Sequence, residues 1–192
     1  GVYIGTIVLL NIPSVQQVMS VFVAEELSDL LNTRVTIGRI NIGLLNRIII
    51  DDVLLDDQDE QEMLKVTRLS AKFDIMPFFK GKISISSVQL FGFNINLQKK
   101  TPDSPPNFKF VLDAFASNDT VKKDNSLDLR INSILIRRGR MAYHVLSEEE
   151  TPGKFNAKHV QLQNIIANIS LKALSKDSIN LGIKRLSLDE KV

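Results

Sequence analysis

The feature that most constrains the fold is an alternation of apolar and polar residues that slips by one position at a regular place. From Arg34 onward, Val, Ile and Leu occupy alternate positions, as they do in a half-buried β-strand. Written as apolar-x-apolar-x-x-apolar-x-apolar, the pattern recurs along the chain. The matches are Val35, Ile37, Ile40 and Ile42; Ile48, Ile50, Val53 and Leu55; Leu64, Val66, Leu69 and Ala71; Ile83, Ile85, Val88 and Leu90; Leu129, Ile131, Ile134 and Ile136; Phe155, Ala157, Val160 and Leu162; and Leu181, Ile183, Leu186 and Leu188.

A slip of one residue has two structural interpretations. The side chains of a strand alternate between its faces with a period of two, so either a β-bulge keeps all the apolar residues on one face or the apolar set changes face midway. A chain rich in Ile, Leu and Val also produces such slips by chance. Because bulges bend and twist a sheet, the repeated slip predicts a strongly curved sheet.

A helix is expected ahead of the strands. Pro13-Ser14 followed by Gln17 has the form of an N-cap with its capping-box partner. The apolar residues that follow fall on one broad helical face, which predicts an amphipathic helix over residues 14–33. Asn32 is the expected left-handed stop of this helix.

A second, shorter helix interrupts the strands. Asn107 precedes a Phe-rich run, which predicts a capped helix near residues 107–117. Polar segments flank this helix at residues 99–106, where Pro is frequent, and at residues 117–126. The helix either packs into the core or covers an apolar cavity as a lid. The candidate lid residues are Phe108, Val111, Leu112 and Phe115.

The first residues are apolar almost throughout, from Val2 to Leu10. This run is about half as long as the roughly 20 residues that span a bilayer. We interpret it either as the stub of a membrane anchor within residues 1–13, cut where Gly1 replaces Met, or as an ordinary buried strand or helical turn. The candidate anchor residues are Ile4, Ile7, Val8, Leu9 and Leu10. The β region of residues 34–192 stops inside a strand-like pattern, which indicates a fragment of a longer protein.

Charge and cysteine content exclude several classes of function. The 192 residues include 24 Lys and Arg and 22 Asp and Glu, a net charge of +2. The basic excess of a phosphate-binding surface is therefore missing, and nucleic acid is not an expected partner. Arg137, Arg138 and Arg140 form a local cluster that is typical of a solvated face. The absence of Cys excludes disulfides and thiolate metal sites.

No motif indicates catalysis or a metal. His144 and His159 lie in strand-like segments without Cys or acidic residues at ligand spacing, so neither is expected to bind a metal. The carboxylates of residues 56–60 fail the EF-hand test, because Glu62 and Arg68 occupy positions that require Gly and Glu. A charged hairpin turn is expected there instead. Without a Gly-x-Ser-x-Gly, P-loop or dinucleotide fingerprint, we expect no catalytic residue and no cofactor, and we do not expect an enzyme.

A long stretch of the chain, from the predicted N-terminal helix to the predicted short helix, resembles a known family. The segments that carry the resemblance are Leu27 to Leu31, Arg34 to Ile40, Val53 to Asp57, Arg68 to Asp74, Phe78 to Ile85 and Val88 to Leu97, followed by the helix after Asn107. Their order and spacing, with the strings VTIGRI, RLSAKFD and KGKISISSVQL, resemble the AsmA-like envelope proteins and, within them, the TamB-like branch. The resemblance covers about residues 14–116, and the remainder matches as further β-repeat. The long acidic turn leaves the subfamily open.

This resemblance implies a location and a role. Proteins of this family have an inner-membrane anchor followed by a periplasmic β-structure, a taco-like or half-barrel groove lined by apolar side chains. They are associated with phospholipid transport between the inner and outer membranes, and the TamB-like members with assembly of outer-membrane proteins alongside an Omp85-type partner. The expected location is therefore the periplasmic side of a bacterial inner membrane.

The combined expectation is a mainly β chain with an N-terminal amphipathic helix, one short helix and a strongly curved antiparallel sheet of bulged strands. Its groove would shelter phospholipid acyl chains. The alternative is a protein-interaction module that uses an open sheet edge to dock an Omp85-type barrel or to template client strands. The candidate groove residues are Ile37, Ile40, Ile42, Ile50, Val53, Leu69, Phe73, Ile85, Val88, Leu90, Ile134 and Ile136.

Overall fold

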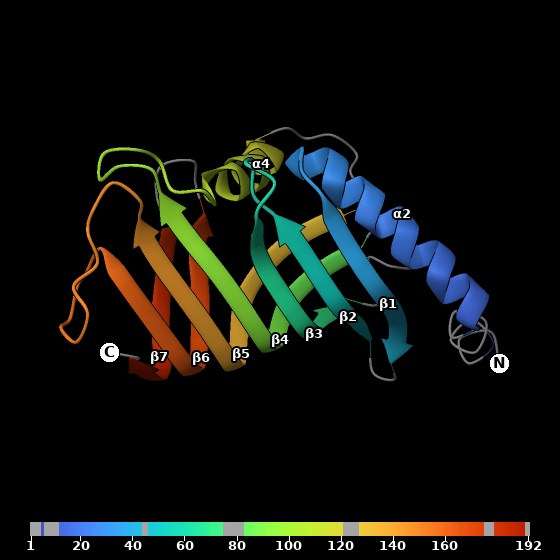
Figure 1. Cartoon of the computed structure of the whole chain (residues 1–192). Helices are drawn as coiled ribbons and strands as arrows, with labels where there is room; N and C mark the ends of the chain where they lie inside the picture. The colour runs from blue at the N-terminus through green and yellow to red at the C-terminus, as the bar shows by residue number, and fades with distance from the viewer. Residues whose placement is uncertain are drawn as a thin grey trace.

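A single sheet of seven β-strands organises the protein, as the computed structural model in Figure 1 shows. The structure describes residues 5, 12–43, 46–74, 83–120, 127–174 and 179–190, without the side chains of 83, 115–120, 127–130, 171–174 and 179–180. The candidate anchor residues Ile4, Ile7, Val8, Leu9 and Leu10 lie outside the described residues.

The described elements confirm a mainly β chain with one long and one short helix. In chain order they are α2 (Pro13–Leu31), β1 (Val35–Gly43), β2 (Arg47–Asp56), β3 (Glu62–Phe73), β4 (Ile83–Lys99), α4 (Lys109–Thr120), β5 (Leu127–Val145), β6 (His159–Leu174) and β7 (Ile179–Glu190). The strands follow each other across the sheet in sequence order, and β1 and β7 form its two edges, so the sheet is open.

The sheet is mixed, which corrects the expectation of an antiparallel one. Most neighbouring strands pair antiparallel, but β4 and β5 pair in parallel. A parallel pair needs a connection that returns to the starting end of the sheet, usually through a helix. Helix α4 lies between β4 and β5 in the chain and belongs to that connection.

Three of the slipped matches, those on β1, β2 and β3, correspond to a row of irregular positions that continues onto β4 and β5. We call this the bulge row. Pairing places the residues of this row beside those of the next strand from β1 to β5, and Asp52, Gly92 and Arg138 have a positive φ, which a regular strand does not adopt. The bulge row consists of Gly38 and Arg39, Asp51 and Asp52, Thr67 and Arg68, Phe91 and Gly92, and Arg137 and Arg138.

The bulge row keeps the apolar residues on one face of the sheet. Val66 and Phe93 belong to one buried cluster. Leu69 and Leu90, three residues away from them along β3 and β4, pack against that same cluster. A strand without a bulge would place residues three apart on opposite faces. The interpretation in which the apolar set changes face midway is therefore wrong for these strands.

One of the sequence matches is wrong. Phe155 and Ala157 lie in the loop before β6, and both are exposed. Strand β6 begins only at His159, because a turn with Gly153 at a φ of +74° precedes it. The matches on β4 and β5 mark a second irregular place, where the register of these two strands shifts between Ile85 and Ser87.

Helix α2 begins differently from the prediction. Its N-cap is Ile12, which makes no side-chain capping bond, and Pro13 occupies the first turn. Proline suits that position because its φ is already helical and its missing N–H would have no partner there, so Ser14 lies inside the helix. The predicted stop is confirmed, since Asn32 has a left-handed conformation with φ of 49°.

Helix α2 does not bury one broad apolar face. Its fully buried residues are Gln16, Ser20 and Leu31, while Val18 and Phe22 are 69% and 60% exposed. The polar side is buried because α2 lies along the edge strand β1 (Figure 1). Its polar side chains bond to β1 as follows: Gln16 Nε2 donates to Asn41 Oδ1, and Ser28 Oγ accepts from the N–H of Val35. The helix thereby covers this edge of the sheet.

Helix α4 packs at one end of the sheet, against the C-terminal part of α2. A buried cluster of Leu31, Val35, Leu55 and Met63 forms there. The α4 segment contributes Phe108, Phe110, Val111 and Ala114 to it. Two of the four candidate lid residues, Phe108 and Val111, thus cover this cluster. The side chain of Phe115 is outside the described residues.

Candidate apolar binding face

The apolar face of the sheet is built from four rows of side chains that run across the strands. Rows A, C and D connect residues that are directly paired on neighbouring strands. In row B the pairing runs from β1 to Phe93 of β4, and Phe93 packs with Ile165 of β6 over Gly139 of β5. Row A contains Val35, Leu55, Leu64, Ile95, Met141 and Leu162; row B contains Ile37, Val53, Val66, Phe93 and Ile165; row C contains Ile40, Ile50, Leu69, Leu90, Ile136, Ala167 and Leu186; and row D contains Ile42, Ile48, Ala71, Val88, Ile134, Ile169 and Ile183.

All twelve candidate groove residues lie in or next to these rows. Two belong to row B, five to row C and three to row D, and Phe73 and Ile85 are paired with each other just beyond row D. Ile40, Phe73 and Val88 are buried, and the other nine are half-buried. The pattern in the sequence therefore selected one continuous surface.

Close packing in row B depends on a glycine that no sequence motif marks. A Cβ added at Gly139 would lie 2.0 Å from the Phe93 ring. Phe93 itself is only 8% exposed and belongs to the buried cluster with Val66 and Ile165. Gly139 thus leaves the space that this aromatic ring fills. The ring lies over β5 at this position and connects the packing of β4 with that of β6.

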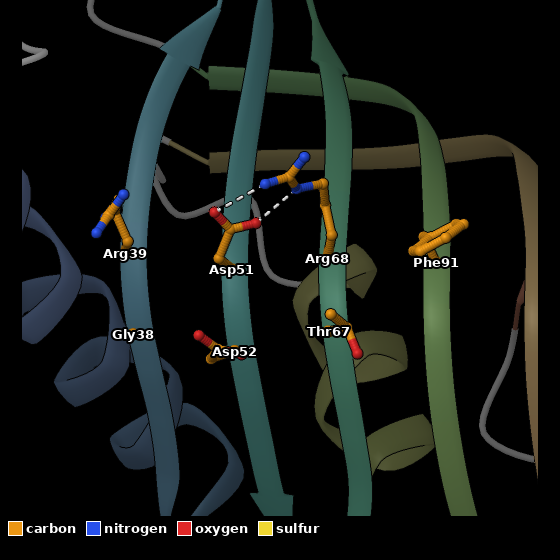
Figure 2. A pocket seen from close by; sticks show the side chains of 7 residues that line it. All are labelled: Gly38, Arg39, Asp51, Asp52, Thr67, Arg68 and Phe91. Carbon is orange, nitrogen blue, oxygen red and sulfur yellow. Dashed lines mark hydrogen bonds and ion pairs between the residues drawn. The ribbon is translucent and has the colours of Figure 1, made fainter.

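The opposite face carries charge along the bulge row. Arg39, Asp51, Arg68 and Phe91 lie next to one another on successive strands and line an open depression (Figure 2). Arg68 donates two hydrogen bonds to Asp51, at 2.6 and 3.2 Å, and this hydrogen-bonded contact raises the pKa of the guanidinium. The Arg138 guanidinium lies 5.4 Å from the centre of the Phe91 ring. The sheet therefore has one apolar and one charged face.

The acidic turn between β2 and β3 has a structural role. Asp57 is only 1% exposed. Its Oδ1 accepts hydrogen bonds from the backbone N–H groups of Asp59 and Gln61 at 2.9 and 3.0 Å. Its Oδ2 accepts from Asn107 Nδ2 at 3.0 Å and Gln98 Nε2 at 3.2 Å. The expected hairpin turn is confirmed, and Asp57 connects it to β4 and to the segment before α4.

Burial and hydrogen bonding act in opposite directions on this carboxylate. Burial by itself raises the pKa of Asp57, but the hydrogen bonds from Asn107, Gln61, Asp59 and Gln98 outweigh it and leave the pKa below its usual value. Asn107 was expected to cap the following helix. Each hydrogen bond that the structure gives its side chain instead goes to Asp57 or to β4.

Sequence reasoning missed a cluster at the joined ends of β5 and β6. His144 and His159 are directly paired, and their Nδ1 atoms lie 3.0 Å apart. Glu150 Oε1 is 3.8 Å from one Nδ1 and 3.9 Å from the other. The expectation that these histidines lack an acidic partner is therefore wrong. The spacing gave no signal because Glu150 belongs to a loop that folds back over the strand ends.

At the far edge, β7 exposes apolar side chains. Leu181, Ile183, Leu186 and Leu188 are between 38% and 56% exposed. Within the described ranges β7 pairs only with β6, so its second edge is open. In contrast to β1, whose edge α2 covers, β7 combines free backbone groups with exposed aliphatic residues.

Comparison of the chain with protein-family models and with curated proteins finds no match. Neither helix that the structure describes is long and apolar enough to cross a membrane.

Proposed function

We propose that this chain is a scaffold that shelters phospholipid acyl chains on the apolar face, and not a catalyst. The observation that carries the proposal is the alignment of rows A to D into one continuous aliphatic surface on a sheet whose other face is charged. A large apolar surface on an open sheet is typical of a site that binds a ligand, a membrane or another protein.

Partial exposure of rows C and D supports this proposal. Helices α2 and α4 pack along β1 and at the row A end of the sheet. Leu69, Leu90 and Ile136 of row C and Ile134 of row D remain half-buried. Each methylene of an acyl chain that these residues cover would contribute roughly 0.8 kcal/mol to binding. An acyl chain of ordinary length therefore needs few polar contacts to bind.

Strand bending also supports a groove. Strands β4 and β5 bend along their length in Figure 1, and their first parts run across the direction of the neighbouring strands in Figure 2. Register irregularities along these strands are the physical cause we assign to the bending. In the proposal, this bend turns the apolar face into the half-barrel groove that was expected from the sequence.

The membrane context is part of the same proposal. The resemblance to AsmA-like proteins and the apolar run from Val2 to Leu10 support a location on the periplasmic side of an inner membrane. Val18 and Phe22 on α2, the helix that follows that run in the sequence, are exposed apolar residues. Phospholipid leaving the inner membrane would then reach the sheet along α2.

Two neighbouring residues on opposite faces provide a matched test. The photo-crosslinking residue benzoylphenylalanine is introduced at Leu90 of row C or at Phe91 of the bulge row, and the whole chain is extracted gently from a lipid-rich membrane fraction. After illumination, mass spectrometry is expected to find phospholipid adducts at position 90 and few at position 91. Equal yields at both positions, or a lipid-free protein in native mass spectrometry, would refute the proposal.

The exposed edge of β7 favours a second candidate function. An edge with exposed Ile183 and Leu186 suits the addition of a strand from an outer-membrane client or from an Omp85-type barrel. The same photo-crosslinking residue at Leu188 distinguishes the two functions. Protein adducts at position 188 without lipid adducts at position 90 would favour the interaction module.

A further inference from the structure

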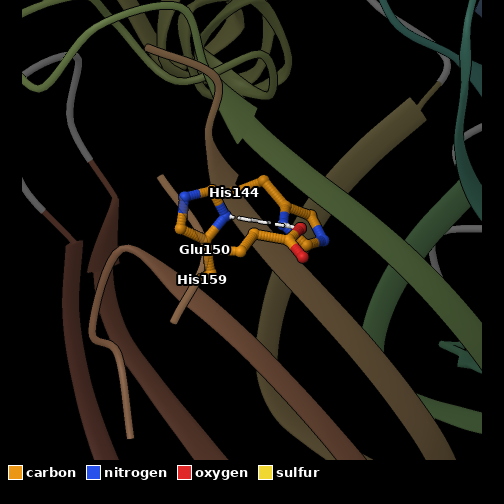
Figure 3. Close-up of side chains that lie close together, drawn as sticks. All are labelled: His144, Glu150 and His159. Atoms are coloured by element: carbon orange, nitrogen blue, oxygen red, sulfur yellow. Dashed lines mark hydrogen bonds and ion pairs between the residues drawn. The ribbon is translucent and has the colours of Figure 1, made fainter. Parts of the chain in front are cut away.

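We propose that His144, His159 and Glu150 form a binding site for a divalent transition-metal ion, with Zn²⁺ as the best match. The site lies at the ends of β5 and β6 and fastens the loop of residues 146–158 to them (Figure 3). It is independent of the lipid-binding face.

The first argument is the orientation of the two imidazoles. His159 Nε2 lies 2.9 Å from the backbone carbonyl oxygen of Glu148. A carbonyl oxygen only accepts hydrogen bonds, so this contact requires the proton on Nε2. Neutral His159 therefore has its lone pair on Nδ1, the atom that faces His144. Metal-bound histidines usually have this arrangement, in which the second ring nitrogen donates to a carbonyl or carboxylate.

The second argument is the distance between the ligand atoms. In a tetrahedral zinc site with bonds of about 2.0–2.1 Å, ligand atoms lie about 3.3 Å apart. Here the two Nδ1 atoms are 3.0 Å apart, and Glu150 Oε1 is 3.8 and 3.9 Å from them. Shifts of about half an ångström or less would complete the geometry. Glu150 is the ligand best able to make them, because its side chain is 68% exposed.

The third argument is that the loop holds its shape through other contacts. Asn156 Nδ2 donates to the carbonyl oxygen of Glu149 at 3.1 Å, and Lys158 pairs with Glu148 at 2.7 Å. The backbone N–H of Leu146 bonds to the carbonyl oxygen of Lys99 at 2.9 Å. Glu150 is thus held near the histidines before a metal binds, which lowers the entropy cost of binding.

The donor set determines the class of ion. Two imidazoles and one carboxylate suit Zn²⁺, Fe²⁺, Co²⁺ or Ni²⁺ and not Ca²⁺ or Mg²⁺, which prefer oxygen ligands. Three protein ligands leave a coordination position for water, and the exposure of Glu150 leaves a path for entry. Because the ligands come from two strands and their connecting loop, we assign the ion the role of fastening this loop.

The test uses the whole chain after treatment with a chelator. Isothermal titration calorimetry with Zn²⁺ is expected to show one site, and Glu150→Gln and His144→Gln to weaken it at least tenfold. Glu149→Gln, a neighbouring carboxylate outside the cluster, should bind like the wild type. Bound Co²⁺ should show visible absorption bands of a four- or five-coordinate site with nitrogen ligands, and these bands should be lost in His144→Gln.

Two results would overturn the proposal. One is Zn²⁺ binding by the wild type no tighter than by the Glu150→Gln and His144→Gln variants. The other is a Co²⁺ spectrum equal to that of the hydrated ion. Thermal melting of each variant without metal checks that it is folded. A variant that fails to fold is replaced by Glu150→Gln alone, whose side chain is on the surface.

Discussion

Removal of the Asp57 carboxylate is expected to destabilise the protein more than removal of any neighbouring acid in the same turn. The change is Asp57→Ala. It leaves two side-chain amides, of Gln98 and Asn107, and two backbone N–H groups without their acceptor. The backbone groups belong to exposed residues, where water replaces the lost bonds, but the two amides are half-buried.

The magnitude follows from these two amides. A buried donor left without its partner costs about 1–3 kcal/mol, so the two together predict a loss of about 3–4 kcal/mol in the free energy of unfolding. Asp59→Ala is the matched control, since Asp59 lies in the same turn and its exposed carboxylate pairs with exposed Lys100. Its expected cost is below about 1 kcal/mol.

The assay is urea denaturation followed by far-UV circular dichroism, with the slope of the transition compared between variants. The pH dependence is a second test. The pKa of Asp57 is lowered in the folded protein from its usual 3.8, so its contribution is complete above that value and is lost as the pH falls through the folded pKa. The difference between the wild type and Asp57→Ala should therefore shrink in acid. Equal losses for Asp57→Ala and Asp59→Ala, or a difference that does not depend on pH, would refute the reasoning.

Two further predictions concern the two faces of the sheet. Gly139→Ala should reduce the free energy of unfolding by about 1–3 kcal/mol, because its Cβ overlaps the buried Phe93 ring; Gly43→Ala, with its nearest atom at 3.5 Å, is the control, and equal denaturation midpoints would contradict the prediction. Arg68→Ala should leave the melting temperature nearly unchanged, because its bonds to Asp51 are made at an exposed position. A large fall in the melting temperature would show that the charged face stabilises the fold.

Local patterns predicted most of the sheet, because a strand's alternation is a property of adjacent residues. The slipped pairs at Arg39, Asp51 and Arg68 showed in the sequence where the bulges lie. The choice between a bulge and a change of face required the tertiary packing, in which Leu69 and Leu90 contact the same cluster as Val66 and Phe93. The strand predicted at Phe155 is wrong because an alternation in the sequence does not form a strand where the segment is not paired in the sheet. Phe155 lies in the loop before β6.

The candidate sites differ in the same way. The residues of the apolar face were predictable because each row repeats a position within the strand pattern. The His144, His159 and Glu150 cluster was not, because its geometry depends on a cross-strand pair and on the path of a loop. The buried side of α2 also depends on its neighbour. Gln16 is buried against the edge strand, where its Nε2 donates to Asn41, and the hydroxyl of buried Ser20 donates to the carbonyl oxygen of Gln16, while Phe22 is exposed.

The sequence by itself determined which segments are strands, which are helices and which residues belong to the apolar face, because these properties follow from periods of two and of 3.6 residues. Tertiary structure decided the parallel pairing of β4 with β5, the side of α2 that is buried and the meeting of two histidines with a glutamate. Those features depend on register and chain path over long separations, which no local pattern of residues specifies.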